Sequence, residues 1–192
     1  MQPTEQILTY LPLLRAIQSI FEKYPRKGVI IGGIAVSLLG EARLTADVDA
    51  LVLLSVADIP ALILHAAEVG IYPRIKNADS FARTNRALLM VHQVTLINVD
   101  FILGMLPFEE EVLQRSHQIT IKDILINLPT VEDLIIMKAV AQRPKDQIDI
   151  QGLVKLNPNL DFKRIEYWVR LFAESLDDPD LWDKTYKQIM RS

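Results

Sequence analysis

Residues 30–54 read IIGGIAVSLLGEARLTADVDALVLL, an apolar run that contains two aspartates one residue apart. Side chains of an extended strand alternate between its two faces, so Asp47 and Asp49 point to one face and Val48 to the other. Two carboxylates buried side by side without a cation cost several kcal/mol, or one of them stays protonated. A magnesium ion removes this conflict, because it binds one or two carboxylates and completes its shell with water and phosphate oxygens.

The D-x-D pattern has a plainer explanation, in which Asp47 caps the preceding turn and Asp49 is exposed at a strand edge. A third carboxylate favours a metal site instead. Asp100 lies in the middle of another apolar run, INVDFIL at residues 97–103. If the two runs are neighbouring strands, the three carboxylates converge in the way that two-metal phosphoryl and nucleotidyl transfer requires.

Gly32 and Gly33 separate the first apolar strand of this stretch from a short helical pattern. Backbone N–H groups at such a turn, together with a helix N-terminus, form a cradle for an anionic phosphate. A tight turn without any ligand explains two glycines equally well. The carboxylates that follow the two glycines in the chain favour the phosphate cradle over the simple turn.

The composition is that of a globular protein with a packed core, and it excludes several kinds of site. The chain has 192 residues, of which 50% are hydrophobic and 23% are charged. Because it has no cysteine, it has no disulfide framework, no thiol nucleophile and no cysteine-based zinc site. Its three histidines, His65, His92 and His117, are scattered and lack the spacing of metal ligands.

Charge and hydropathy point away from a membrane and from nonspecific binding of nucleic acid. The formal net charge is −3 and there is no basic run, although a local basic patch stays open. No apolar segment reaches the roughly 18 to 20 residues of a membrane span. The first residues, MQPTEQ, lack the basic region of a signal peptide. We therefore expect a cytoplasmic protein without a membrane partner.

Hydrophobic periodicity predicts strands and helices in alternation, followed by a helical C-terminal part. Thr4 is a candidate cap of the first helix, and Pro12 is expected to kink or split that helix. Thr130 and Asp133 form a candidate capping box for a later helix. Strands are expected at 27–33 and 47–54, with two strands or a bent hairpin at 85–104 and one or two further strands at 118–129. Helices are expected at 4–24, 34–40, 57–70, 107–116, 130–143, 144–156, 161–176 and 180–190.

This order of elements predicts an α+β (α/β) protein with a mixed β-sheet core flanked by helices. The core with its leading helix is expected over residues 1–128. A C-terminal helical lobe is expected over residues 129–192, either separate or packed on the core as one domain. Trp168 and Trp182 recur with helical spacing in that lobe, which favours core packing over a base-stacking platform.

A Gly-Gly turn, a helix, a D-x-D strand and a later strand with one acidic residue follow one another in this chain. This order resembles the nucleotidyltransferase superfamily typified by DNA polymerase β and the minimal bacterial nucleotidyltransferases. GEARLTADVDALV at residues 40–52, with its R-x-T-x-D-x-D run, looks like the small prokaryotic branch that includes AbiEii-type toxin proteins. VEDLIIMKAVAQRPKDQIDIQGL at residues 131–153, with a lysine and a later K-D-x-x-D segment, is similar to the C-terminal helical signature there. The similarity spans about Val29 to Leu153.

The resemblance implies a polymerase-β-like nucleotidyltransferase core and a role for each motif. Gly32 and Gly33 would hold the triphosphate of an NTP such as ATP. Asp47 and Asp49 would bind magnesium, two ions in all, and Asp100 would be the third ligand that helps to activate an acceptor hydroxyl. Many active members have Gly-Ser where this chain has Gly-Gly, so one hydroxyl contact to phosphate is missing. The C-terminal half has no obvious nucleic-acid-binding element, so we expect neither a polymerase role nor DNA as a partner.

Further charged and polar residues suit phosphate binding, each with a plainer alternative. Arg43 and Thr45 precede the D-x-D strand, where they contact phosphate or simply stabilise a loop. Lys138 lies in an apolar helix, and its amine reaches either a cleft that holds phosphate or the protein surface. Asp146 and Asp149 share a helical face, where they orient a cation such as Lys138 or, more simply, form the polar side of the helix.

Two hypotheses follow for the function. In the first, the protein is a magnesium-dependent nucleotidyltransferase that moves an NMP from an NTP to an acceptor hydroxyl and releases pyrophosphate. The acceptor is tRNA or another RNA, a protein or a small molecule. In the second, the protein is a catalytically weak relative that serves as an interaction module, for example one partner of a toxin–antitoxin pair. The three retained carboxylates favour the first hypothesis, and the Gly-Gly turn keeps the second open.

Overall fold

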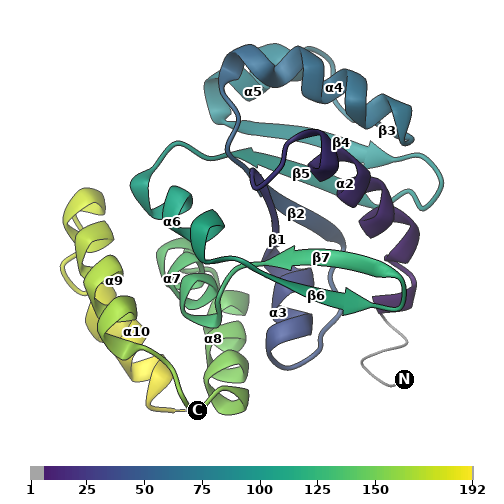
Figure 1. The fold of residues 1–192 in the computed structure, drawn as a ribbon. Helices are drawn as coiled ribbons and strands as arrows, with labels where there is room; N and C mark the ends of the chain where they lie inside the picture. The colour runs from purple at the N-terminus through teal and green to yellow at the C-terminus, as the bar shows by residue number, and fades with distance from the viewer. Residues whose placement is uncertain (1–6, 192) are drawn as a thin grey trace. The chain divides into compact units, whose positions relative to one another are not determined.

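The computed structural model describes residues 7–191, which fall into two compact units. Unit 1 comprises residues 7–34 and 44–129, and unit 2 comprises residues 35–43 and 130–191. Thr4, the expected cap of the first helix, lies outside the described residues. Figure 1 labels the helices and strands of both units.

Unit 1 is built on a five-stranded mixed sheet (Figure 1). The strand order is β1-β2-β5-β4-β3, in which β2 and β5 are parallel and the other neighbours are antiparallel. β2 and β5 are inner strands of this sheet, which agrees with their apolar sequences. The strands are β1 (Gly28–Ile31), β2 (Asp47–Val52), β3 (Ile71–Pro73), β4 (Ala87–His92) and β5 (Asn98–Leu103).

Alternation along β2 and β5 separates buried side chains from partly exposed ones. In β2, Val48 is fully buried, whereas Asp47 and Asp49 are partly exposed. In β5, Val99 is fully buried and Asp100 is partly exposed. The three carboxylates therefore share one face of the sheet, as the period of two residues predicts.

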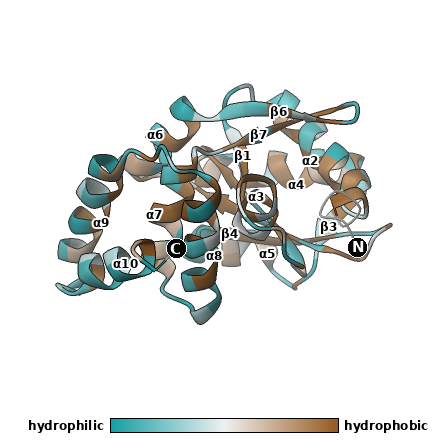
Figure 2. Cartoon of the chain, turned by 90° about the horizontal axis from the view of Figure 1, so that it is seen from below, coloured by the Kyte–Doolittle hydropathy of each residue, from teal (hydrophilic) through white to brown (hydrophobic). Residues whose placement is uncertain are grey.

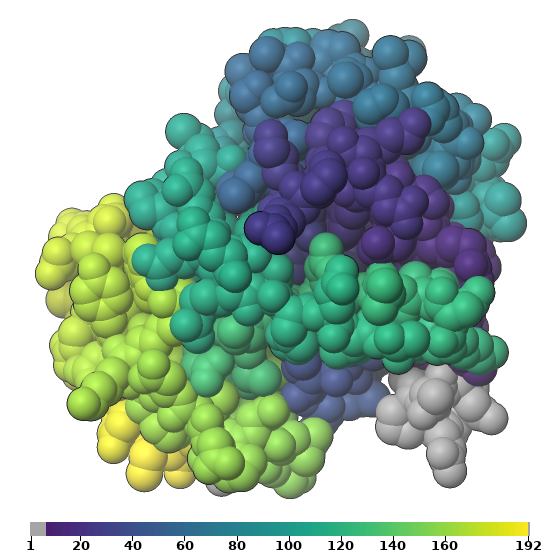
Figure 3. Space-filling view, viewed as in Figure 1, coloured from purple at the N-terminus to yellow at the C-terminus, as the bar shows by residue number. Residues whose placement is uncertain are grey.

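Helices and a β-hairpin complete unit 1. The helix expected over residues 4–24 is split, one of the two outcomes predicted for Pro12: residues 7 and 8 are helical, residues 9 and 10 form a turn, and α2 begins at Leu11. Pro12 lies in the first turn of α2, where a helix needs no N–H donor. The β6–β7 hairpin packs against β1 and α2, and the side-chain amide of Asn127 donates a hydrogen bond of 3.1 Å to the carbonyl of Gly28. The hairpin is the green band directly below α2 in Figure 3. These elements are α2 (Leu11–Lys23), α3 (Gly32–Leu39), of which residues 35–39 belong to unit 2, η1 (Val56–Asp58), α4 (Ile59–Glu68), α5 (Ala78–Asn85), α6 (Pro107–Arg115), β6 (His117–Ile121) and β7 (Ile124–Leu128).

Two helices of unit 2 begin at residues whose side chains accept a hydrogen bond from a free backbone N–H. The Thr130 hydroxyl accepts a hydrogen bond of 3.2 Å from the N–H of Asp133, and the Asp161 carboxylate accepts one of 3.1 Å from the N–H of Arg164. Both are N-cap interactions. The Asp133 carboxylate does not complete the predicted capping box but accepts a hydrogen bond of 2.7 Å from Nε of Arg164. The helices are α7 (Val131–Ala141), α8 (Pro144–Leu156), α9 (Phe162–Leu176) and α10 (Leu181–Ile189).

Apolar faces hold the helices of unit 2 together. Trp168 on α9 and Trp182 on α10 are buried, as expected for core packing. Hydrophilic residues line the outer turns of α9 and α10, and α3 is apolar along most of its length (Figure 2).

Residues 35–43 join unit 2 through polar contacts: Glu41 pairs with Lys155 at 2.6 Å, and the carbonyl of Leu39 accepts a hydrogen bond of 2.8 Å from Asn157.

The α+β class and the mixed sheet predicted from the sequence are confirmed. Two elements between residues 71 and 85 were not predicted. β3 has three residues and ends in a proline, and α5 buries two alanines, Ala78 and Ala82, where a periodic apolar stripe would be the usual signal. Within the part of the chain that the structure describes, no helix is long and apolar enough to cross a membrane.

The cap of α7 gives a first prediction. Thr130→Ala removes the acceptor for the N–H of Asp133, so we expect the free energy of unfolding to fall by about 1 kcal/mol. Thr130→Ser keeps the acceptor and should lose much less. Urea unfolding followed by circular dichroism measures both, and an equal loss in the two variants would show that the hydroxyl does not cap the helix.

Candidate functional site

The structure brings together the three carboxylates that the sequence singles out. Asp49 and Asp100 are direct register partners on the parallel strands β2 and β5, and Asp47 precedes Asp49 on the same face. Neighbouring strands lie about 4.8 Å apart, so the Asp49 and Asp100 side chains leave the sheet next to each other. We call these three residues the acidic face.

The loop before β2 fixes the first carboxylate of the acidic face. The Thr45 hydroxyl donates a hydrogen bond of 2.9 Å to Oδ1 of Asp47. The Tyr10 hydroxyl in turn donates to the carbonyl of Thr45. Thr45 therefore orients Asp47 in this structure, and its predicted contact with phosphate stays a prediction.

Gly32 fits against the second carboxylate for two separate reasons. Its φ of +65° lies in the left-handed region that favours glycine, and a Cβ atom at this position would lie 2.0 Å from Oδ2 of Asp49. Gly32 and Gly33 also begin α3, whose N-terminal end carries partial positive charge. Asp49 thus lies against a helix end that stabilises a carboxylate, and the two glycines stand where the sequence predicts a phosphate cradle.

Arg74, which the sequence analysis did not single out, engages the third carboxylate. It follows β3 directly, reaches across β4, and its guanidinium bonds both oxygens of Asp100, with Nη2 at 3.1 Å from Oδ2. Nη1 also donates a hydrogen bond of 3.0 Å to the carbonyl of Met90. The hydrogen bond to Asp100 and the charges of Asp100, Asp47 and Asp49 raise the pKa of Arg74, while its burial acts in the opposite direction.

The acidic face fits a divalent cation in chemistry and in charge. Its carboxylate oxygens are the hard ligands that magnesium prefers, and with Arg74 the four side chains sum to a charge of −2. In their present arrangement, however, no three His, Asp or Glu side chains of residues 7–191 form a group that could hold a metal ion. In this arrangement Arg74 engages both oxygens of Asp100.

The other predicted site residues, Arg43, Lys138 and Asp146, form a cluster in unit 2, in which Lys138 and Asp146 are buried and Arg43 is partly exposed. Nζ of Lys138 lies 3.0 Å from Oδ1 of Asp146 and 2.8 Å from Oδ2 of Asp149. Nε of Arg43 lies 2.6 Å from Oδ1 of Asp149. Arg143 also pairs with Asp146, at 2.7 Å.

The geometry of this cluster shows whether Lys138 reaches the surface and whether Asp146 and Asp149 are solvated, two points that the sequence left open. The Lys138 side chain is 4% exposed, so it does not reach the surface. Asp146 and Asp149 are buried and orient Lys138, so the plainer interpretation, a solvated polar side of the helix, is wrong. Burial makes each charge depend on its partners, because an unpaired buried charge is costly. Phosphate binding by Arg43 and Lys138 stays a prediction.

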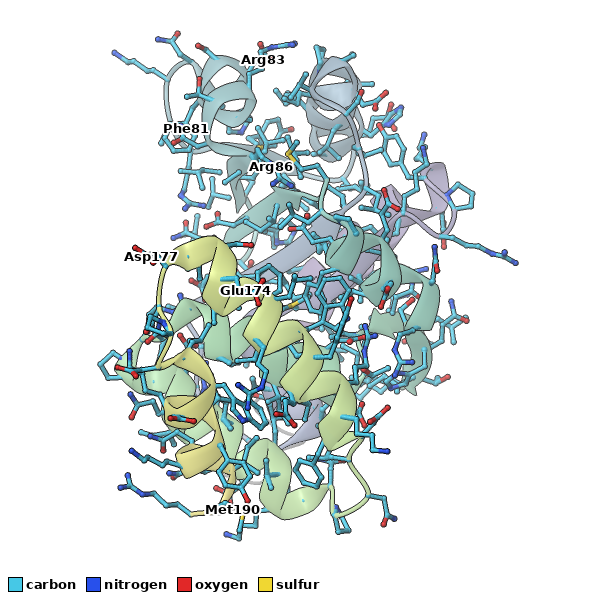
Figure 4. The ribbon with its side chains drawn as sticks, turned by 90° about the vertical axis from the view of Figure 1, so that its left-hand side faces the viewer. Phe81, Arg83, Arg86, Glu174, Asp177 and Met190 are labelled. Carbon is cyan, nitrogen blue, oxygen red and sulfur yellow. The ribbon has the colours of Figure 1, made fainter. Side chains whose placement is uncertain are left out.

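A wide pocket of about 1270 Å³ lies elsewhere in unit 1, where β2 and β5 end. Arg83, on α5, and Arg86, directly after α5, line it, and both are labelled in Figure 4. Each is already paired, Arg83 with Asp79 at 2.9 Å and Arg86 with Glu109 at 3.1 Å. The residues of the acidic face do not line this pocket, so it is a separate feature of the unit.

The mixed sheet, the three carboxylates on one face and the Gly-Gly start of α3 define a nucleotidyltransferase-like protein. The chain belongs to the family DUF6036, described as a nucleotidyltransferase of unknown function, whose model matches residues 10–186. The predicted superfamily is thereby confirmed. The AbiEii-type branch is not named by this match and stays a prediction.

Structural comparison agrees with this fold. The chain is similar to JHP933 from Helicobacter pylori with a TM-score of 0.52 and 12% sequence identity, over 97% of this chain and 90% of that chain. At this identity the likeness shows the fold alone. No curated protein matches the chain.

Two glycines with positive φ test the close approach of Gly32 to Asp49. Gly70 has a φ of +77° and open space, since the nearest atoms to an added Cβ lie 3.9 Å away on His92. We expect Gly70→Ala to lower the free energy of unfolding by about 1 kcal/mol, the cost of the backbone conformation alone. Gly32→Ala should lose clearly more, because it also displaces the Asp49 carboxylate. Equal losses in urea unfolding would contradict the close approach.

The buried cluster of unit 2 predicts a dependence of stability on pH. Burial raises the pKa of Asp146, but hydrogen bonds from Arg143 and Lys138 outweigh it and lower the pKa below the ordinary value of 3.8. A lowered folded-state pKa gives stability that is present above about pH 4 and is lost as the pH falls through the folded value. We expect Asp146→Asn to cost about 2 kcal/mol at pH 7.

The difference between the wild type and Asp146→Asn should shrink when urea unfolding is repeated at pH 3, because the carboxyl of the unfolded chain then takes up a proton that the folded protein binds less readily. Asp79→Asn, which removes an exposed carboxylate, is the control and should change little at either pH. A difference that stays constant with pH would mean that the charge of Asp146 does not stabilise the fold.

Proposed function

We propose that this protein is a magnesium-dependent nucleotidyltransferase that transfers an NMP from an NTP to an acceptor hydroxyl. The observation that carries the proposal is the register of Asp49 and Asp100, with Asp47 on the same face and the start of α3 against Asp49. Membership of a family described as nucleotidyltransferases supports it.

We assign each residue of the acidic face a role in this reaction. Asp47 and Asp49 would hold magnesium, with Asp100 as the third carboxylate. When bound there, the metal would supply positive charge against the polyphosphate and make the acceptor hydroxyl more acidic. The N–H groups at Gly32 and Gly33 bind phosphate oxygens at the start of α3. Asp100 takes the proton of the acceptor hydroxyl.

The bond changes in the transfer balance without a further reactant. The acceptor oxygen forms a bond to the α-phosphorus, and the bond from this phosphorus to the bridging oxygen breaks. Pyrophosphate leaves with the electron pair. The acceptor is a hydroxyl of RNA, such as tRNA, of a protein or of a small molecule.

One observation favours the second candidate, a catalytically weak interaction module such as a toxin–antitoxin partner. Arg74 engages both oxygens of Asp100, which leaves the third carboxylate in an ion pair. Incubation of the protein with magnesium, each labelled NTP, and total RNA or total protein separates the two candidates. Label transferred to either fraction supports the enzyme. If no label is transferred and calorimetry detects no NTP binding, the enzyme is refuted.

Substitution of the acidic face predicts loss of transfer without loss of fold. We expect Asp47→Asn, Asp49→Asn and Asp100→Asn each to lower the rate of NMP transfer at least about 100-fold, because changes that merely reorient metal ligands already cost 10- to 100-fold. Asp79→Asn is the matched control, since this exposed carboxylate lies in the same unit and pairs with Arg83. Circular dichroism should show that all four variants are folded. Full activity of any acidic-face variant would contradict the assigned site.

A further inference from the structure

We propose that Arg74 is an internal counter-ion of the acidic face: it holds Asp100 while no metal is bound and gives Asp100 up when a divalent cation binds. The proposal rests on the proposed metal site and assigns a positioning role to a residue outside the three carboxylates. It makes the third carboxylate available only when the cation arrives.

The geometry gives Arg74 the form of a replaceable cation. Its guanidinium engages both oxygens of Asp100, so the fork and the carboxylate match as a bidentate pair. The pair is neither deeply buried nor fully solvated, since the side chains of Arg74 and Asp100 are 24% and 20% exposed. A cation can therefore approach Asp100 from solvent. Solvent screens the ion pair only partly, so the pair still holds Asp100 in place.

The anchor of Arg74 explains why it can move without unfolding the sheet. Its backbone N–H continues the pairing of β3 with β4 through a hydrogen bond of 3.1 Å to the carbonyl of Leu89. The side chain alone crosses β4 to reach Asp100, with one added hydrogen bond to the carbonyl of Met90. Release of Asp100 thus needs a change of side-chain rotamer and no change in strand register.

Charge makes the guanidinium and a divalent cation competitors. The field of Asp47, Asp49 and Asp100 acts on Arg74 together. With Arg74 present the four side chains sum to −2, and without it the three carboxylates sum to −3. A divalent cation bound by all three carboxylates would lie close to the guanidinium in its present position, and two cations at short distance repel each other.

Binding of Mn²⁺ alone to the full-length protein tests the proposal without any nucleotide or acceptor. Isothermal titration calorimetry should show that Arg74→Gln binds Mn²⁺ at least about tenfold more tightly than the wild type. Arg74→Lys keeps a charge but loses the bidentate fork, so its affinity should lie between the two. Arg83→Gln is the control, because it removes an exposed arginine that pairs with Asp79, and its affinity should equal that of the wild type.

A thermal melt supplies a second readout that does not depend on calorimetry. Without metal, Arg74→Gln should melt below the wild type, since Asp100 then loses the guanidinium that bonds both of its oxygens. Mn²⁺ should raise its melting temperature more than that of the wild type, because a ligand stabilises the state that it binds. If Arg74→Gln does not fold without metal, Arg74→Lys takes its place, and the rise in its melting temperature with Mn²⁺ is compared with that of the wild type.

A double-mutant cycle assigns the effect to Asp100. In an Asp100→Asn background, Arg74→Gln should change Mn²⁺ affinity much less than it does in the wild type. Equal or weaker Mn²⁺ binding by folded Arg74→Gln, relative to the wild type, overturns the counter-ion proposal. So does an undiminished effect in the Asp100→Asn background.

The outcomes also separate this proposal from the proposed function. Tighter Mn²⁺ binding by Arg74→Gln without NMP transfer in any assay would support the counter-ion role of Arg74 and refute the nucleotidyltransferase activity. NMP transfer by the wild type with unchanged Mn²⁺ affinity in Arg74→Gln would support the nucleotidyltransferase activity and refute the counter-ion role. No Mn²⁺ binding by any variant would refute the counter-ion role, and the transfer assay would still decide the nucleotidyltransferase activity.

Discussion

The adjacency of Asp49 and Asp100 on two parallel strands is the constraint that the rest of unit 1 accommodates. Two carboxylates at neighbouring positions repel each other, and a slip of one residue in the register would turn the carboxylate of the shifted strand toward the buried face. Strand pairing therefore cannot relieve the repulsion. The surroundings do so instead: Arg74 pairs with Asp100, and the start of α3 at Gly32 lies against Asp49.

These compensations differ in how firmly they are built into the fold. The positive φ of Gly32 and its contact with Asp49 are backbone features, so they persist as long as β1, α3 and β2 keep their places. The contact of Arg74 is made by a long side chain and can be exchanged for another cation. The acidic face thus has one fixed element and one exchangeable one, as expected of a site that changes its charge balance when a ligand binds.

The sequence predicts those parts of the site that depend on local pattern. The shared face of Asp47 and Asp49 follows from strand alternation, and the Gly-Gly turn follows from the change of period at residue 32. The pairing of Asp49 with Asp100 required a family resemblance, because no local pattern relates strands about fifty residues apart. Arg74 was missed because β3, from which it extends, is too short to give a strand signal.

Unit 2 shows the same limit in another form. A lysine in the apolar helix α7 indicates that a partner is needed, but not which one. Its partners, Asp146 and Asp149, lie on α8, and they face Lys138 because the chain turns at Gln142, which has a φ of +52°. Whether two helices place given side chains together depends on their packing, and a helical period in each does not specify it.

The net charge of each cluster distinguishes a structural network from a ligand site. In unit 2, Arg43, Lys138 and Arg143 meet Asp146 and Asp149, so nearly every charge has a partner within the protein and the sum is +1. The acidic face with Arg74 sums to −2 although it is only partly exposed. An excess of this size is costly for the protein alone and is matched by one divalent cation. The excess, more than the number of carboxylates, is the physical reason to expect a metal at the acidic face, and the same argument makes Arg74 the residue through which the site adjusts when the metal is absent.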